Sequence, residues 1–105
     1  MSGNRRQGSL GATTLRRAAK VDTNHGEVRD HLRAIGWSVS DTASLGKGYG
    51  DLTVSRLGHT AIVETKFERR GLNDKQREFR DGWQGAYFVV RSPEDAEKQL
   101  TLWLL

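Results

Sequence analysis

The chain has 105 residues, a formal net charge of +4 and no cysteine. At this length it forms one small domain with a single modest hydrophobic core. The lack of cysteine excludes disulfides, thiolate nucleophiles, zinc fingers and iron–sulfur sites, and is typical of a reducing cytoplasm. No apolar run approaches the roughly 18 residues of a membrane span, and no apolar segment typical of a signal peptide is present. We therefore expect a cytoplasmic protein with no membrane partner.

The positive charge is concentrated near the N-terminus. Residues 1–20 contain five basic residues and no acidic residue, which leaves a net charge of −1 on the remainder. Their Gly-, Ser- and Thr-rich composition predicts a disordered arm over residues 1–20, followed by a folded domain over residues 21–105. Such an arm indicates a polyanionic partner, most simply nucleic acid, although a solubilising tail would have a similar composition. The arm residues that we expect to contact nucleic acid are Arg16, Arg17 and Lys20.

A first helix is predicted from about residue 24 to residue 35. Asn24 suits the N-cap position, Gly36 suits the C-terminal stop, and apolar residues recur at i, i+4 and i+7 between them. Glu27 borders this apolar stripe and has two interpretations. It either closes a capping box with Asn24 or places a carboxylate at the edge of a functional site, and the spacing alone favours the capping box.

The alternating residues 37–40 predict the first strand. The glycine-rich segment 45–50 follows as a loop before Asp51. It is not a Walker loop, because no Gly-Lys-Ser/Thr opens a helix there. Its flexibility would let Lys47 and Tyr49 approach a phosphate or a base, and a plain connecting loop explains it equally well.

Residues 50–66 predict a β-hairpin. Two β-rich runs flank Gly58 and His59, and glycine at the first central position suits a two-residue turn. With this turn, Val54 pairs with Val63. A four-residue loop with the same centre would keep each side chain on the same face, whereas a three-residue loop would reverse one strand.

Strand alternation gives this hairpin two different faces. Asp51, Glu64 and Lys66 share one face, and Asp51 is expected to pair with Lys66. The other face is apolar and carries Leu52, Val54, Ala61 and Val63. The polar face is either a solvated ion-pair surface or a divalent-cation site, because Mg²⁺ prefers a few carboxylates completed by water and phosphate oxygens.

Two arginines follow the strand that carries Lys66. Arg69 and Arg70 form a basic exit from that strand. They are candidates for phosphate contacts, and ordinary solvated side chains are almost as good an explanation.

A second helix is predicted over residues 73–83. Its buried side is marked by Leu72, Phe79 and Trp83. Gln76 falls on the same stripe, and a polar side chain there needs a hydrogen-bond partner. It either closes a capping box with Asn73 or donates into the carboxylate cluster.

The C-terminal part predicts one more strand and one more helix. The continuous apolar run 86–90 is typical of a strand that is buried on both faces. Pro93 suits the first turn of the last helix. Leu102 and Leu105 lie off the apolar stripe of that helix, so they belong to the core, to a frayed end or to a dimer contact.

The predicted order is helix, strand, strand with Asp, strand with Glu-x-Lys, helix, strand, helix. This order resembles the core of the PD-(D/E)xK nuclease superfamily, and its local texture resembles the small stand-alone VRR-NUC nucleases of phages and bacteria. The matching residues are Glu27, Gly48-Tyr49-Gly50-Asp51, Glu64-Thr65-Lys66 and Leu72-Asn73-Asp74-Lys75-Gln76. The resemblance covers about three quarters of the chain, residues 22–99. The chain departs from the family at Gly50, where proline is usual.

The resemblance implies an α/β fold with a restriction-endonuclease-like core, a central mixed β-sheet flanked by helices in the order αβββαβα. The catalytic residues that it implies are Glu27, Asp51, Glu64, Lys66 and Gln76. Asp51 and Glu64 would bind Mg²⁺ or Mn²⁺, with help from the backbone around Thr65. Lys66 would position or activate water, Glu27 would assist the site, and Gln76 would support it.

The function that follows is a metal-dependent endonuclease that hydrolyses DNA phosphodiester bonds. The family further implies a homodimer that cleaves branched DNA, in a bacterial cell or a phage-infected host. Three alternatives stay open on the sequence alone. They are a sequence-directed restriction-like or homing endonuclease, a non-catalytic nucleic-acid-binding module, and a protein whose polar hairpin face is only an ion-pair network.

Overall fold

The computed structural model describes residues 24–105, so the predicted arm with Arg16, Arg17 and Lys20 lies outside the described residues. A helix over residues 24–34 comes first. The elements after it are β1 (Ser38–Asp41), the 3₁₀ helix η1 (Ala43–Leu45), β2 (Leu52–Arg56), β3 (His59–Thr65), α3 (Asp74–Gly82), β4 (Ala86–Val90) and α4 (Pro93–Leu104). The predicted order of helices and strands is confirmed. Within the described range, no helix is long and apolar enough to cross a membrane.

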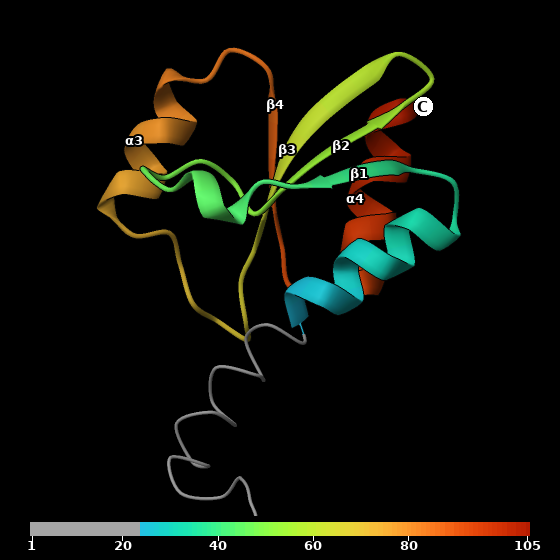
Figure 1. Ribbon diagram of the computed structural model, residues 1–105, viewed down its shortest axis with the longest axis horizontal. Coiled ribbons are helices and arrows are strands. Elements are labelled where there is room, and N and C mark those ends of the chain that lie inside the picture. Colours follow the sequence, from blue (N-terminus) through green and yellow to red (C-terminus); the bar gives the residue numbers. More distant parts are fainter. Residues whose placement is uncertain (1–23) are drawn as a thin grey trace, which may run out of the picture.

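The four strands form one mixed sheet in the order β1-β2-β3-β4. The β1–β2 and β2–β3 pairs are antiparallel, whereas β3 and β4 are parallel and are connected through α3. The helix over residues 24–34 and α4 lie on one side of the sheet, and α3 lies on the other (Figure 1). This arrangement confirms the predicted α/β class, in which helices flank a central mixed sheet.

The hydrophobic core fills the side of the sheet that faces the first helix and α4. Its buried members are Val28, Leu32, Trp37, Leu52, Val54, Ala61, Val63, Val90, Ala96 and Leu100. Burying one leucine side chain contributes roughly 1.5–3 kcal/mol, so Leu32 and Leu100 are major anchors of the two helices. The apolar face predicted for the hairpin is therefore correct in all four of its residues.

The hairpin turn lies one residue earlier than predicted. Arg56 pairs with His59, so the turn consists of Leu57 and Gly58. Both turn residues have a positive φ, 54° and 83°, which is typical of a type I′ turn with glycine in second place. The prediction placed glycine first, as in a type II′ turn. The register shifts by two residues, an even number, so every side chain keeps its predicted face.

The prediction that residues 86–90 are buried on both faces was wrong. The strand β4 lies at the edge of the sheet, and Val90 is its one buried residue. Its last two carbonyl groups are satisfied in different ways, one by a side chain of α4 and the other by continuation of the ladder with β3. The Val89 carbonyl accepts a hydrogen bond from Gln99 Nε2 at 2.9 Å, and the Val90 carbonyl accepts one from the Lys66 amide at 2.9 Å.

The ends of the helices differ in detail from the predictions. The helix α3 ends at Gly82, and Trp83 is its C-cap with 39% of its surface exposed, so Trp83 does not mark a buried side. Residue 24 is already helical, and whatever precedes it lies outside the described range. Leu102 and Leu105 are exposed, which excludes the core interpretation for both.

The turn residue Leu57 offers a test of the hairpin. It holds a left-handed conformation at φ 54° with 82% of its surface exposed, and asparagine adopts this conformation more readily than leucine. We expect Leu57→Asn to raise the free energy of unfolding by about 0.5–1 kcal/mol. Urea denaturation measures this change. Gly58→Ala should lower stability, and equal stability of both variants would contradict the type I′ turn.

Candidate active site

The polar face of the hairpin gathers two carboxylates and one ammonium group. Leu52 pairs with Val63, so Asp51, immediately before β2, lies beside Glu64 of β3. The Glu64 side chain is only 4% exposed, and Lys66 Nζ lies 3.5 Å from its Oε2 atom. The structure thus brings Asp51, Glu64 and Lys66 together on the face that alternation predicts.

Gln76 connects α3 to this cluster. Its Oε1 atom accepts a hydrogen bond from the Asn73 backbone amide, and the backbone amide of Gln76 donates to Asn73 Oδ1, each at 2.9 Å. Its Nε2 atom donates to Glu64 Oε2 at 2.8 Å. Both sequence interpretations of Gln76 therefore hold at once, because one end of the side-chain amide caps the helix and the other end binds the carboxylate.

Within residues 24–105, each of the two carboxylates is held mainly through one oxygen. Asp51 Oδ2 accepts hydrogen bonds from the Thr65 backbone amide at 2.9 Å and from its hydroxyl at 2.6 Å. Glu64 Oε2 is held by Gln76 and Lys66. Glu64 Oε1, by contrast, is buried and has no hydrogen-bond partner among the described residues. Fixed carboxylates with an oxygen left over are well prepared to bind a cation.

The environment of Glu64 disfavours its charged form. Burial, together with the neighbouring Asp51 carboxylate, raises its pKa to about 7, although Lys66 and a hydrogen bond from the Asp51 backbone amide act in the opposite direction. A carboxyl group that is buried beside a like charge keeps its proton unless a cation compensates the charge. The donor set therefore fits a divalent cation better than it fits an ordinary surface ion pair.

The composition of this site suits Mg²⁺ or Mn²⁺ rather than a fully protein-bound ion. Among residues 24–105, no group of three or more His, Cys, Asp or Glu side chains could hold a metal ion. Two carboxylates completed by water and phosphate oxygens are the usual environment of Mg²⁺. Glu27 is exposed on the first helix and does not join Asp51 and Glu64 in such a group. The role of Glu27, and that of the Thr65 backbone as a ligand, stay predictions.

The glycines before Asp51 are required by close packing. A Cβ atom on Gly48 would lie 2.2 Å from the Lys75 carbonyl oxygen, and one on Gly50 would lie 2.3 Å from Ile62 Cγ2. Both contacts are far shorter than van der Waals separation. Ile62 therefore fills the space that a side chain at position 50 would need. The loop is held between the N-terminus of α3 and β3, and so it fixes the start of β2.

The loop residues that we predicted to bind nucleic acid lie in different environments. Lys47 is exposed, with a positive φ of 57°. Tyr49 is half-buried, and its ring packs on Phe79 with centroids 4.9 Å apart. Phe79 stacks in turn on Trp83 at 5.3 Å. Tyr49 therefore helps attach α3 to the sheet, whatever contact it makes with a ligand.

Arg69 and Arg70 are exposed in the loop that leaves β3. Arg91 fixes this loop, because its Nη1 atom donates to the Glu68 carbonyl at 2.8 Å and to the Arg70 carbonyl at 2.6 Å. Arg91 thus holds the basic loop that follows Lys66. The arrangement suits phosphate binding, and Arg91 was not expected from the sequence.

Tyr87 is a further residue of this region that the sequence did not indicate. Its hydroxyl is buried and has no hydrogen-bond partner among the described residues. Burial, together with the nearby charges of Glu64 and Asp51, raises its pKa to about 12. In the sequence Tyr87 is one member of an apolar run, and nothing there tells which strand lies beside it.

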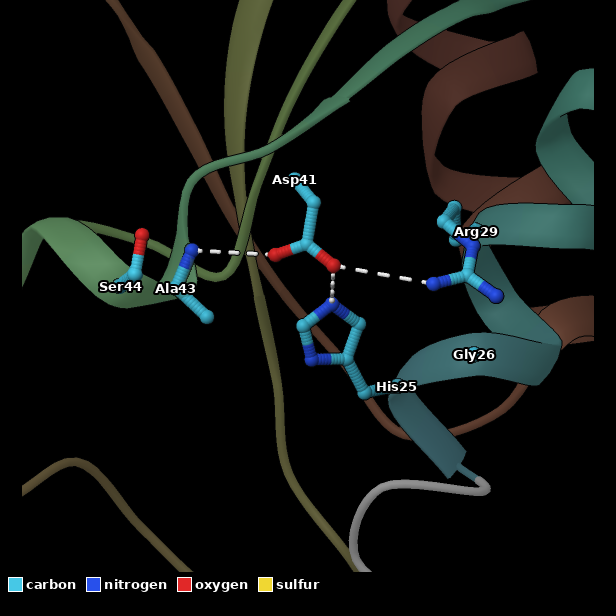
Figure 2. A pocket seen from close by; sticks show the side chains of 6 residues that line it. All are labelled: His25, Gly26, Arg29, Asp41, Ala43 and Ser44. Atoms are coloured by element: carbon cyan, nitrogen blue, oxygen red, sulfur yellow. Dashed lines mark hydrogen bonds and ion pairs between the residues drawn. The ribbon is translucent and has the colours of Figure 1, made fainter.

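A separate cavity of about 590 Å³ lies between the first helix and the end of β1 (Figure 2). Asp41 lines it, and its Oδ2 atom lies 3.1 Å from His25 Nε2 and 3.7 Å from Arg29 Nη1. Its other carboxylate oxygen accepts a hydrogen bond from the Ala43 amide at 3.3 Å. Asp41 is thus already compensated, and this group ties the helix to β1.

Comparison with known proteins agrees with the geometry. A solved structure described as a VRR_NUC domain is 25% identical to this chain and superposes with a TM-score of 0.61; the match covers 78% of this chain and 95% of that chain. No protein-family model and no curated protein matches the sequence. The chain has a VRR-NUC-like nuclease fold, consistent with the PD-(D/E)xK superfamily, as the resemblance implied.

The raised pKa of Glu64 gives the stability of the metal-free protein a defined pH dependence. The folded protein binds this proton more tightly than the unfolded chain does, so unfolding releases it between pH 4.5 and about 7, and stability falls as the pH rises. A change in pKa from 4.5 to about 7 corresponds to a loss of roughly 3 kcal/mol. Glu64→Gln should remove this loss and be more stable than the wild type at pH 8.

Urea denaturation of both proteins at pH 4 and pH 8 in EDTA measures the difference. Glu78→Gln, which changes an exposed glutamate of α3, serves as the matched control and should follow the wild type. A stability difference between wild type and Glu64→Gln that is independent of pH would contradict the raised pKa of Glu64.

The contact between residues 50 and 62 can be tested by a double-mutant cycle. Gly50→Ala should destabilise the protein by a few kcal/mol, because the added methyl group meets Ile62 Cγ2. The same substitution should cost less in an Ile62→Ala background, where that contact is absent, although Ile62→Ala itself leaves a cavity. Urea denaturation of the four proteins gives the coupling energy. Simple additivity would show that Ile62 is not the reason for glycine at position 50.

Proposed function

We propose that this protein is a divalent-metal-dependent endonuclease that hydrolyses phosphodiester bonds in DNA. The observation that carries the proposal is the buried Glu64 carboxylate, which lies beside Asp51 and has one oxygen without a hydrogen-bond partner. Its occurrence in a VRR-NUC-like fold supports the reaction class. In this proposal Asp51 and Glu64 hold the cation through their free oxygens.

A bound Mg²⁺ or Mn²⁺ would polarise the phosphoryl group and lower the pKa of a coordinated water. The residues of the chain have distinct tasks around that centre. Thr65 fixes the orientation of Asp51, and Gln76 fixes that of Glu64, so neither carboxylate has to reorganise during the reaction. The Lys66 side chain is mostly buried. Its ammonium group would donate a hydrogen bond to the attacking water or to the phosphate oxygens on which negative charge develops.

The position of Lys66 is set by the backbone as well as by its side chain. Its amide donates to the Val90 carbonyl, which continues the ladder between β3 and β4 past Thr65. Its ammonium group lies on Glu64 Oε2, the oxygen that also accepts from Gln76. Glu64 Oε1 thus stays available to the cation, and the ammonium group stays next to it.

The DNA substrate is proposed to lie across the basic residues around the site. Arg69 and Arg70 would contact phosphates after β3, and Lys47 would contact them from the glycine-rich loop. Selectivity for branched DNA and a homodimer belong to the same proposal, since a symmetric dimer would place two sites on opposed strands of a junction. The exposed Leu102 and Leu105 of the C-terminal segment offer apolar surface for such a contact.

Cleavage assays with isosteric variants test the catalytic residues. Labelled four-way junction, flap, duplex and single-stranded DNA are incubated with Mg²⁺, Mn²⁺ or EDTA. We expect metal-dependent cleavage by the wild type and a loss of about 10²-fold or more for Asp51→Asn, Glu64→Gln and Lys66→Met, because each removes a group that acts on the transition state. Added Mn²⁺ should raise the melting temperature of the wild type and much less that of Glu64→Gln.

Matched controls come from the other side of the sheet. Glu97→Gln and Lys98→Met change exposed residues of α4, and both should cleave like the wild type. If the wild type cuts no DNA with any metal, yet binds DNA equally well in Mg²⁺ and EDTA, the protein is a non-catalytic binding module and the proposal is wrong.

A further inference from the structure

The hydroxyl of Tyr87 is a buried polar group that nothing in the described chain satisfies. An unsatisfied buried hydroxyl costs stability, and native proteins keep few of them. Where one persists at the edge of a site, an ion, a water or a ligand that binds there is the natural explanation. The surroundings of Tyr87 indicate which kind of ligand could bind its hydroxyl.

The sheet places Tyr87 on the same face as the carboxylates. In the parallel pair of β3 and β4, Tyr87 lies opposite Ile62, and Val89 lies opposite Glu64. Paired residues of neighbouring strands share a face. The Tyr87 side chain therefore lies on the same face as Ile62 and Glu64, and its pairing partner Ile62 is two residues before Glu64. Its ring contacts Phe79 of α3 at 6.1 Å between centroids. Tyr87 thus belongs to the wall that α3 and the sheet build around Glu64.

Two orphan polar atoms therefore occur in one small region. Glu64 Oε1 is an acceptor without a donor, and the Tyr87 hydroxyl has no partner either. They do not satisfy one another in the structure. A ligand oxygen that binds beside Glu64 would give the hydroxyl an acceptor, and a cation would give Glu64 Oε1 its counter-charge.

The charges around Tyr87 define which role its hydroxyl can take. Burial and the negative charges of Glu64 and Asp51 raise its pKa to about 12, and the positive charge of Arg80 opposes them. The phenol therefore stays protonated at every working pH. It can donate a hydrogen bond, but it cannot serve as a base.

We propose that Tyr87 is a positioning residue of the site, whose hydroxyl donates a hydrogen bond to an oxygen ligand held beside Glu64. The inference rests on the proposed nuclease function and adds one residue to its machinery. The ligand oxygen belongs either to a water of the cation or to the scissile phosphate. Both offer the same acceptor, and the two sources differ in whether the hydrogen bond forms before DNA binds.

The test compares wild type with Tyr87→Phe, which removes only the hydroxyl. The matched control is Ser55→Ala, because the Ser55 hydroxyl lies on the same face and is already paired with Thr60 Oγ1 at 3.0 Å. Three quantities are measured: the melting temperature in EDTA, the affinity for Mn²⁺ without DNA by titration calorimetry, and kcat and KM for DNA cleavage.

We expect Tyr87→Phe to melt no lower than the wild type, since it loses a group without a partner. If the ligand is a water of the cation, Mn²⁺ affinity falls about tenfold. If the ligand is the phosphate, Mn²⁺ affinity is unchanged and kcat falls about tenfold or more, the effect of losing one hydrogen bond to a charged group. Ser55→Ala should change neither quantity.

Two results would overturn the proposal. Wild-type values of both Mn²⁺ affinity and kcat in Tyr87→Phe would show that the hydroxyl does not contact a ligand. A lowered melting temperature with both values unchanged would show a purely structural role. If the wild type cleaves no DNA at all, the nuclease proposal fails by itself, and the melting and Mn²⁺ data still decide whether Tyr87 belongs to a cation site.

Discussion

The hydrogen bond from Gln76 to Glu64 joins the helix α3 to the sheet at the candidate site. It matters because no residue of α3 is fully buried, so the apolar contacts of this helix are made by partly exposed side chains. The place of α3 depends on this polar link and on the packing of Phe79 against Tyr49. Glu64 is almost fully buried beside Asp51, and a buried carboxylate needs hydrogen-bond donors because it has lost its contact with water. Attaching the helix and orienting the carboxylate are therefore the same event, and loosening one would loosen the other.

The glycine-rich loop is subject to a second constraint from the same helix. Gly48 touches the backbone of the first turn of α3, and Gly50 touches Ile62 on the site face of β3. A loop that looks flexible in the sequence is thus pressed between two elements. Since Asp51 follows directly, its position is determined by backbone packing and by the two hydrogen bonds from Thr65. Both carboxylates are preorganised, which is the condition under which electrostatic stabilisation of a transition state is most effective.

Alternation along the strands was predictable because its period of two belongs to the chain itself. The grouping of Asp51, Glu64 and Lys66 followed from it, even though the turn was assigned wrongly. The turn type could not be read, because glycine suits the first place of one turn and the second place of another. The spacing of Asn73 and Gln76 likewise showed a capping box but not that the far end of Gln76 reaches Glu64. The role of Tyr87 could not be predicted for a different reason. Its neighbour across the sheet depends on the strand order, and a long connection separates β4 from β3 in the sequence.

The two faces of the sheet meet opposite physical requirements. The face toward α4 is closed by aliphatic side chains and stabilises the domain. The other face buries a carboxyl group, leaves one of its oxygens without a partner and adds an unpartnered hydroxyl. An ion-pair network would not explain this face, since Lys66 supplies one positive charge against the two carboxylates of Asp51 and Glu64, and the pair stays negative when both are ionised. In the proposed function, a divalent cation would compensate the remaining charge, and a phosphodiester would bring the additional oxygens that such a cation prefers. The stability that this face costs the domain is therefore the physical argument for the proposed function.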